Sequence, residues 1–103
     1  MRTRAKVDAT QAEIVGALKK AGATVQPLHT VGKGCPDLLV GYRGRNWLIE
    51  CKPNVGGPKK QSLRDNQREW FDGWKGQAAV VQDGDAALAV IGAIGLHLAG
   101  QVE

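Results

Sequence analysis

Hydrophobic residues recur at helical spacing in three segments of the chain. The first segment opens at Asp8 with residues that can cap a helix, carries apolar side chains over residues 14–18, and meets a stop signal at Gly22. The second begins near Ser62, and its regularly spaced side chains are Leu63, Gln67, Trp70, Phe71 and Trp74. We expect both tryptophans in the core. The third, residues 86–98, is apolar on nearly every side, which predicts an internal or partnered helix.

Short apolar runs between breaker residues predict the strands. Residues 24–28 form a first strand that Pro27 restricts to an edge or an end, and residues 78–81 form a last strand buried on both faces. Between them, residues 38–42 and 47–52 flank a loop with Gly44, which is typical of a β-hairpin. The order of these elements predicts one α/β domain over residues 1–103 with a central sheet.

The register of this hairpin decides where three charged residues lie. With the turn centred on Gly44 and Arg45, Asp37 pairs with Lys52, and Leu39 pairs with Glu50. Directly opposite residues share a face of a sheet, so Asp37, Glu50 and Lys52 should converge. A slip of one residue would scatter them, which makes the register a firm prediction.

The charged cluster has two chemical interpretations. Two carboxylates held close together suit a hard cation such as Mg²⁺ or Mn²⁺. A lysine beside them can orient a water or offset charge on a transferring phosphoryl group, so the set suits phosphodiester hydrolysis. The alternative is a salt bridge between Asp37 and Lys52 across the two strands, with Glu50 exposed to solvent.

Four ordered sequence elements resemble the VRR-NUC branch of the PD-(D/E)XK nuclease superfamily. They are Gly34-x-Pro36-Asp37-Leu38, the hydrophobic strand after it, Ile49-Glu50-x-Lys52, and Leu63-x-x-x-Gln67-x-x-Trp70. The resemblance covers about residues 8–83. It implies a restriction endonuclease-like fold, with a mixed central β-sheet flanked by helices, and a divalent-metal-dependent endonuclease that acts on DNA.

The resemblance also implies which residues act. The implied catalytic set is Asp37, Glu50, Lys52, Gln67 and Glu13. Asp37, Glu50 and the backbone carbonyl of Cys51 would hold Mg²⁺ or Mn²⁺, and Lys52 would position the attacking water or stabilise the transition state. Glu13 matches the family's first-helix glutamate, which reaches the metal directly or through water. Stand-alone members are small, occur in phages among other places, and form homodimers resembling Holliday junction resolvases, which implies a homodimer that cuts junction or flap DNA.

Two of these residues have structural alternatives. Glu13 borders the apolar side of its helix, so a capping or surface role is open to it. Gln67 is a polar residue within an apolar stripe, and leaving its amide unsatisfied would cost about 1–3 kcal/mol. The site carboxylates or a metal-bound water could supply its partners, and so could a backbone hydrogen bond within the core.

Charge is distributed unevenly along the chain. All 14 lysines and arginines lie within residues 1–75 beside seven acids, whereas residues 76–103 carry three acids and no basic residue. A basic surface attracts phosphate backbones without regard to sequence. The candidate DNA contacts are Lys33, Lys59, Lys60, Arg64 and Arg68. An ordinary basic protein without a nucleic-acid partner is the alternative.

Composition narrows the setting and leaves two rival function classes. No segment resembles a signal peptide or is long and apolar enough to cross a membrane, so we expect a soluble protein of the cytoplasm, or of the host cytoplasm if a phage encodes it. Cys35 and Cys51 suggest no disulfide framework, and a zinc site with His29 lacks the usual ligand spacing. The rivals are a non-catalytic DNA-binding module on a nuclease-like fold and a small interaction protein that docks through its apolar C-terminal helix.

Overall fold

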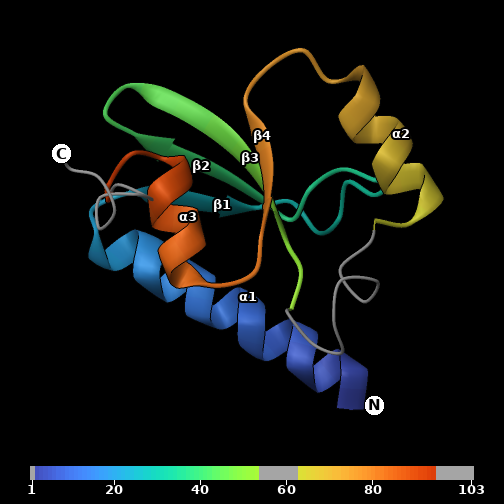
Figure 1. Cartoon of the computed structure of the whole chain (residues 1–103), viewed down its shortest axis with the longest axis horizontal. Helices are drawn as coiled ribbons and strands as arrows, with labels where there is room; N and C mark the ends of the chain where they lie inside the picture. Colours follow the sequence, from blue (N-terminus) through green and yellow to red (C-terminus); the bar gives the residue numbers. More distant parts are fainter. Residues whose placement is uncertain (1, 54–62, 95–103) are drawn as a thin grey trace, which may run out of the picture.

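The computed structural model describes residues 2–53 and 63–94, and these form a four-stranded sheet with three helices (Figure 1). In chain order the elements are α1 (Arg2–Lys20), β1 (Thr24–Pro27), β2 (Leu38–Tyr42), β3 (Arg45–Cys51), α2 (Asp65–Gly73), β4 (Ala78–Val81) and α3 (Gly84–Val90). The strands lie in the order β1-β2-β3-β4. The first three are antiparallel and β4 runs parallel to β3, so the sheet is mixed, as predicted.

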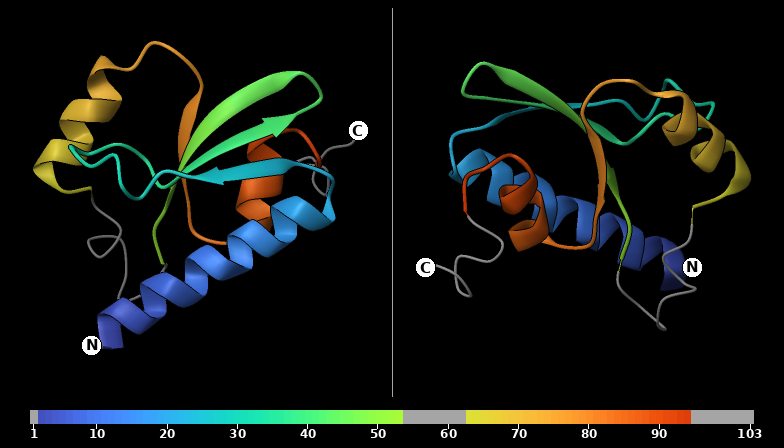
Figure 2. Two further views of the ribbon diagram at one scale, coloured as in Figure 1. Left: turned by 180° about the vertical axis from the view of Figure 1, so that it is seen from behind. Right: turned by 45° about the horizontal axis from the view of Figure 1, so that its top comes forward.

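Helices α1 and α3 cover one face of the sheet, whereas α2 stands beyond the end of the strands (Figures 1 and 2). The core lies between the sheet and helices α1 and α3, and its fully buried side chains include Ile14, Leu18, Leu38, Val40 and Ile49. On the opposite face, Leu39 and Val80 keep 37% and 39% of their surface exposed. The functional candidates on β3 must therefore be sorted by which of these two faces they point to.

Helix α1 ends where the sequence predicts. Gly22 has a φ of 97°, and its backbone N–H donates to the carbonyl of Lys19. The N–H of Ala23 donates to the carbonyl of Leu18, which completes a Schellman motif. The start of the helix differs from the prediction, because α1 begins at Arg2 and the capping residues near Asp8 lie inside it.

The hairpin has a different turn from the predicted one. Tyr42 pairs with Arg45, so the loop consists of Arg43 and Gly44, with φ values of 50° and 80°. A two-residue hairpin loop of type I′ needs positive φ at both central positions, and Gly44 meets this need at the second. The register therefore moves by two residues. Because an even shift keeps every side chain on its face, the predicted convergence of the charged residues survives.

The outer strands bear out one prediction and contradict another. β1 is an edge strand, as Pro27 requires. β4 forms the other edge and is buried on one face only, since Val81 is 2% exposed and Val80 is 39% exposed. The continuous apolar run of residues 78–81 misled the prediction, because the run does not tell a central strand from an edge.

Helix α3 is shorter than residues 86–98 suggest. It begins after Asp83, whose side chain accepts a hydrogen bond from the backbone N–H of Ala86, and it ends at Val90. Gly92, with a φ of 82°, closes it with the same motif that ends α1. Residues 95–98 of the predicted helix lie outside the described residues. Within the described ranges, no helix has the length and apolar character needed to span a membrane.

Candidate active site

The predicted charged residues meet in one pocket, with a volume of about 410 Å³, at the end of β3. Its wall combines the loop that precedes β2, the last residues of β3 and the first turn of α2. The charged and amide side chains that line it are Lys33, Asp37, Glu50, Lys52, Arg64, Asn66 and Gln67. Four of the five predicted catalytic residues therefore lie together, although they come from three separate segments of the chain.

Asp37 is fixed by the backbone of the neighbouring strand. It follows the buried Pro36 and directly precedes β2, and its Oδ2 accepts a hydrogen bond of 2.8 Å from the backbone N–H of Cys51. Since Leu38 pairs with Ile49, Asp37 stands opposite Glu50 and not opposite Lys52. The predicted strand pairing of Asp37 with Lys52 is thus wrong. The ion pair of Lys52 is formed with Glu50 instead of Asp37.

Glu50 is a buried carboxylate, and one of its two oxygens has no hydrogen-bond partner among the described residues. It is 3% exposed and points to the face away from α1 and α3, because its neighbours Ile49 and Cys51 are in the core. Its Oε2 lies 3.7 Å from Nζ of Lys52 and accepts a hydrogen bond from Gln67. Its Oε1 is buried and has no hydrogen-bond partner among the described residues. The alternative of an exposed Glu50 is therefore wrong.

Burial makes the charged form of both carboxyl groups in the pocket unfavourable. Burial, and next the negative charge of Asp37, raise the pKa of Glu50 to about 7. Burial also raises the pKa of Asp37, against the lowering effects of the Cys51 N–H and of Lys52. A buried carboxylate oxygen without a partner among the described residues, beside a second carboxyl group with a raised pKa, is an arrangement that a bound cation would stabilise.

Gln67 forms both of the predicted kinds of hydrogen bond, one with a site carboxylate and one with the backbone. Its Nε2 donates to Oε2 of Glu50 over 2.8 Å, and its Oε1 accepts from the backbone N–H of Arg64 over 2.9 Å. The second bond caps the first turn of α2, and it holds the amide in one orientation. Because Gln67 is 4% exposed, the pair of bonds ties the helix directly to the acidic site.

Gly34 allows the loop before β2 to touch α2. Its φ is 82°, and a Cβ at this position would lie 2.7 Å from the backbone carbonyl carbon of Asn66. Only glycine tolerates both the left-handed conformation and this approach. Gly34 therefore positions the turn of α2 that carries Gln67, which gives a physical reason for the glycine in the Gly34-x-Pro36-Asp37 element.

We expect Gly34→Ala to cost about 2–4 kcal/mol of unfolding free energy, because positive φ and backbone overlap both penalise the new methyl group. Gly32→Ala is the matched control, since Gly32 has a φ of 73° and open space at its Cβ. It should cost only about 1 kcal/mol. Urea unfolding of both variants measures the difference, and equal losses would show that the contact with Asn66 does not matter.

Comparison with solved structures finds a chain described as a VRR_NUC domain. It superposes with a TM-score of 0.59 and 25% sequence identity, over 84% of this chain and 94% of that chain. This chain has the fold of a VRR_NUC domain. A scan against protein-family models gives no match, and a search of curated proteins gives none either. The structural match is thus the comparison that supports the nuclease-like fold, which is the fold that the resemblance of the four sequence elements implies.

Glu13 does not join the acidic pair in this VRR_NUC fold. It is exposed on α1, and its Oε2 accepts a hydrogen bond of 3.1 Å from the backbone N–H of Gly84, at the start of α3. Helix α1 packs on the face of the sheet opposite to Glu50, which explains the separation. No three His, Cys, Asp or Glu side chains in the described part of the chain form a possible metal site. The prediction that places Glu13 at the metal is corrected accordingly.

The predicted DNA contacts divide into three groups. Lys33 and Arg64 line the pocket. Arg68 is exposed on α2, where its Nη2 donates to the carbonyl of Leu63. Lys59 and Lys60 lie outside the described residues.

The tryptophans of α2 are not the core residues that their spacing predicts. Trp74 is 46% exposed, and its ring stacks on that of Trp70 with centroids 4.7 Å apart and an interplanar angle of 15°. The prediction fails because α2 stands away from the sheet and its first turn docks on the loop around Gly34.

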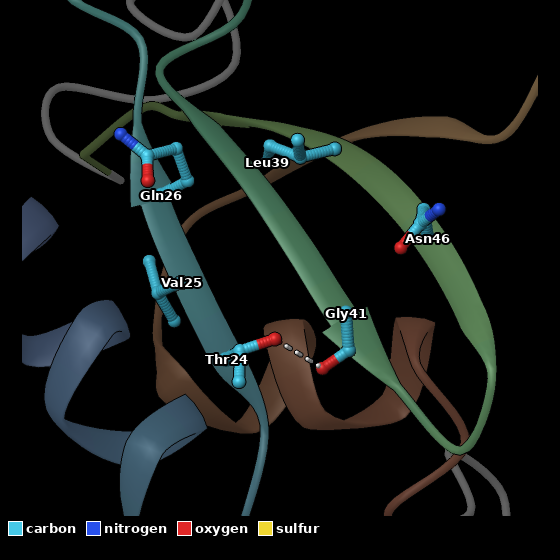
Figure 3. Close-up of a pocket in the computed structure, with 6 residues that line it drawn as sticks. All are labelled: Thr24, Val25, Gln26, Leu39, Gly41 and Asn46. Atoms are coloured by element: carbon cyan, nitrogen blue, oxygen red, sulfur yellow. Dashed lines mark hydrogen bonds between the residues drawn. The ribbon is translucent and has the colours of Figure 1, made fainter.

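A second hollow, of about 220 Å³, lies on the open face of the sheet between β1, β2 and β3 (Figure 3). It exists because Gly41 has no side chain, and Oγ1 of Thr24 donates to the Gly41 carbonyl across its floor. Its remaining lining consists of Val25, Gln26, Leu39 and Asn46. None of these side chains is an acid or a base at neutral pH, whereas the pocket at the end of β3 combines carboxylates with basic side chains and is therefore the candidate active site.

Proposed function

We propose that this domain is a divalent-metal-dependent endonuclease that hydrolyses phosphodiester bonds in DNA. The observation that carries the proposal is the buried Oε1 of Glu50, which has no hydrogen-bond partner among the described residues and lies in a pocket that also holds Asp37 and Lys52. A buried carboxylate oxygen without a donor is costly unless a cation completes its surroundings.

The donor set fits a hard cation. Asp37 and Glu50 supply carboxylate oxygens from neighbouring strands, and we assign the backbone carbonyl of Cys51 as the third protein ligand. Oxygen ligands of this kind favour Mg²⁺ or Mn²⁺ over softer metals. When bound, such a cation supplies Lewis-acid stabilisation of the phosphate charge and a more acidic water.

The other side chains prepare the site for a phosphate. Lys52 brings its ammonium group to within 3.7 Å of Glu50, where it can orient the attacking water or offset the charge that develops on the phosphate. Gln67 holds Oε2 of Glu50 through its amide hydrogen bond, so Oε1 would be the oxygen that binds the cation. Lys33 and Arg64 border the same pocket, so they can contact phosphates on either side of the cut.

We further propose that the substrate is branched DNA, such as a four-way junction or a flap, and that two copies act together as a homodimer. A symmetric dimer presents two identical sites, which suits a substrate cut on paired strands. The support for this step is the resemblance of the chain to stand-alone VRR-NUC proteins, together with its concentration of basic residues within residues 1–75.

A cleavage assay on four-way, flap and linear duplex DNA tests the proposal. We expect cutting with Mg²⁺ or Mn²⁺, none with EDTA, and faster cutting of the branched substrates. Binding without cutting under all metal conditions would favour the non-catalytic DNA-binding module. Cutting that persists in EDTA would overturn the mechanism.

A further inference from the structure

The side of α2 that faces the active site continues into an exposed aromatic pair. Helix α2 ends at Gly73, and Trp74 is its C-cap residue, seven residues or almost two helical turns after Gln67, so the two positions follow one another along the same side of the helix. Trp70 lies between them, and its ring stacks on that of Trp74. One stripe thus begins at the amide that binds Glu50 and ends at an aromatic ring that is 46% exposed.

Charged residues are sorted around this stripe. Arg64, the N-cap residue of α2, and Arg68, one turn further along, are exposed and border one edge of the stripe. The exposed acidic residues of the helix, at positions 65, 69 and 72, fall on the side away from the stripe. An aromatic surface bordered by cations, with the anions behind it, complements a strand that offers flat bases and phosphates.

We propose that Trp74, backed by Trp70, is a stacking platform for an unpaired base of the DNA strand that is held at the active site. This inference rests on the proposed function and deepens it, because it names single-stranded character next to the cut as the recognised feature. An aromatic ring stacks on any base, so the platform reads the absence of pairing and not the sequence.

The distance sets which base is held. Seven residues of helix span about 10 Å. Stacked bases rise by about 3.4 Å each and an unstacked strand rises by more, so the platform lies no more than about three nucleotides from the phosphate at Glu50. In a flap or a junction, unpaired bases occur close to the branch point, whereas a linear duplex offers none.

The test compares a short single-stranded oligothymidine with an abasic oligonucleotide of the same length and charge, by fluorescence anisotropy in EDTA. We expect the protein to bind the oligothymidine about ten-fold more tightly, and Trp74→Ala to remove this difference. The affinity for the abasic strand should not change in Trp74→Ala, because its phosphates meet the same cations. Trp74→Phe, which keeps a ring, should retain most of the preference.

Tryptophan emission gives a second reading. Trp74 is exposed while Trp47 is 8% exposed, so quenching by oligothymidine should be largely lost in Trp74→Ala. Equal binding of the two oligonucleotides, or an unchanged preference in Trp74→Ala, would overturn the inference. So would a change from dimer to monomer in Trp74→Ala without any change in the preference, because the ring would then contact a second copy. These measurements need no cleavage, so their failure is distinct from a failure of the proposed nuclease activity.

Discussion

Asp37→Asn should reduce metal-dependent DNA cleavage by a factor on the order of 10³, because it removes a charged ligand from the proposed cation site. Asparagine has almost the same shape, and its carbonyl can still accept the hydrogen bond from the backbone N–H of Cys51. The variant should therefore fold. Single-turnover cleavage of branched DNA, with Mg²⁺ or Mn²⁺ in excess, measures the loss.

Lys52→Ala is the matched control for this experiment. It should also cut slowly, but it leaves both carboxylates in place, so Mg²⁺ or Mn²⁺ should still raise its melting temperature. Asp37→Asn should lose that stabilisation together with cleavage. Full activity in Asp37→Asn would refute the assignment of Asp37 as a metal ligand.

Without metal, the free energy of unfolding should fall as the pH rises from about 4.5 to about 7, because burial raises the pKa of Glu50 from 4.5 to about 7. Below this window Glu50 is protonated in both states and costs nothing. Within it, the folded protein keeps a proton that the unfolded chain has lost, so each step up in pH favours unfolding. The full difference is about 3 kcal/mol and is reached above the window.

Glu50→Gln should remove most of this pH dependence, since glutamine carries no proton that titrates. The raised pKa of Asp37 acts in the same direction and should leave a smaller slope. Glu69→Gln, at an exposed position of α2, is the control and should follow the wild-type profile. Urea unfolding between pH 4 and 8 gives the curves, and Mg²⁺ added at about pH 8 should restore stability to wild type only. Parallel curves for wild type and Glu50→Gln would contradict the buried ionisation.

The register of the hairpin shows which features of a sheet the local sequence pattern predicts and which it does not. The sequence places Asp37, Glu50 and Lys52 on one face of the sheet, and the structure keeps them there although the turn is centred one residue earlier. The alternation of side chains along a strand protects the face from an even shift, but it does not fix the partner. The position of Asp37 opposite Glu50, in place of Lys52, depended on the actual turn.

The sequence by itself determined the features that depend on neighbouring residues. These include the stop of α1 at Gly22, the edge position of β1, the face shared by the charged residues, and an amide in the stripe of α2 that needs a polar partner. Each follows from backbone conformation or from side-chain period, which act over a few residues.

Only the tertiary structure decided which surfaces meet. In the structure, Glu13 binds the start of α3, Trp74 is exposed, and Gly34 lies against the first turn of α2. A helical period reveals which residues share a side, but not what that side packs against, because packing depends on where the chain places segments far apart in sequence. For the same reason, only the tertiary structure could show that Oε1 of Glu50 is buried without a hydrogen-bond partner among the described residues.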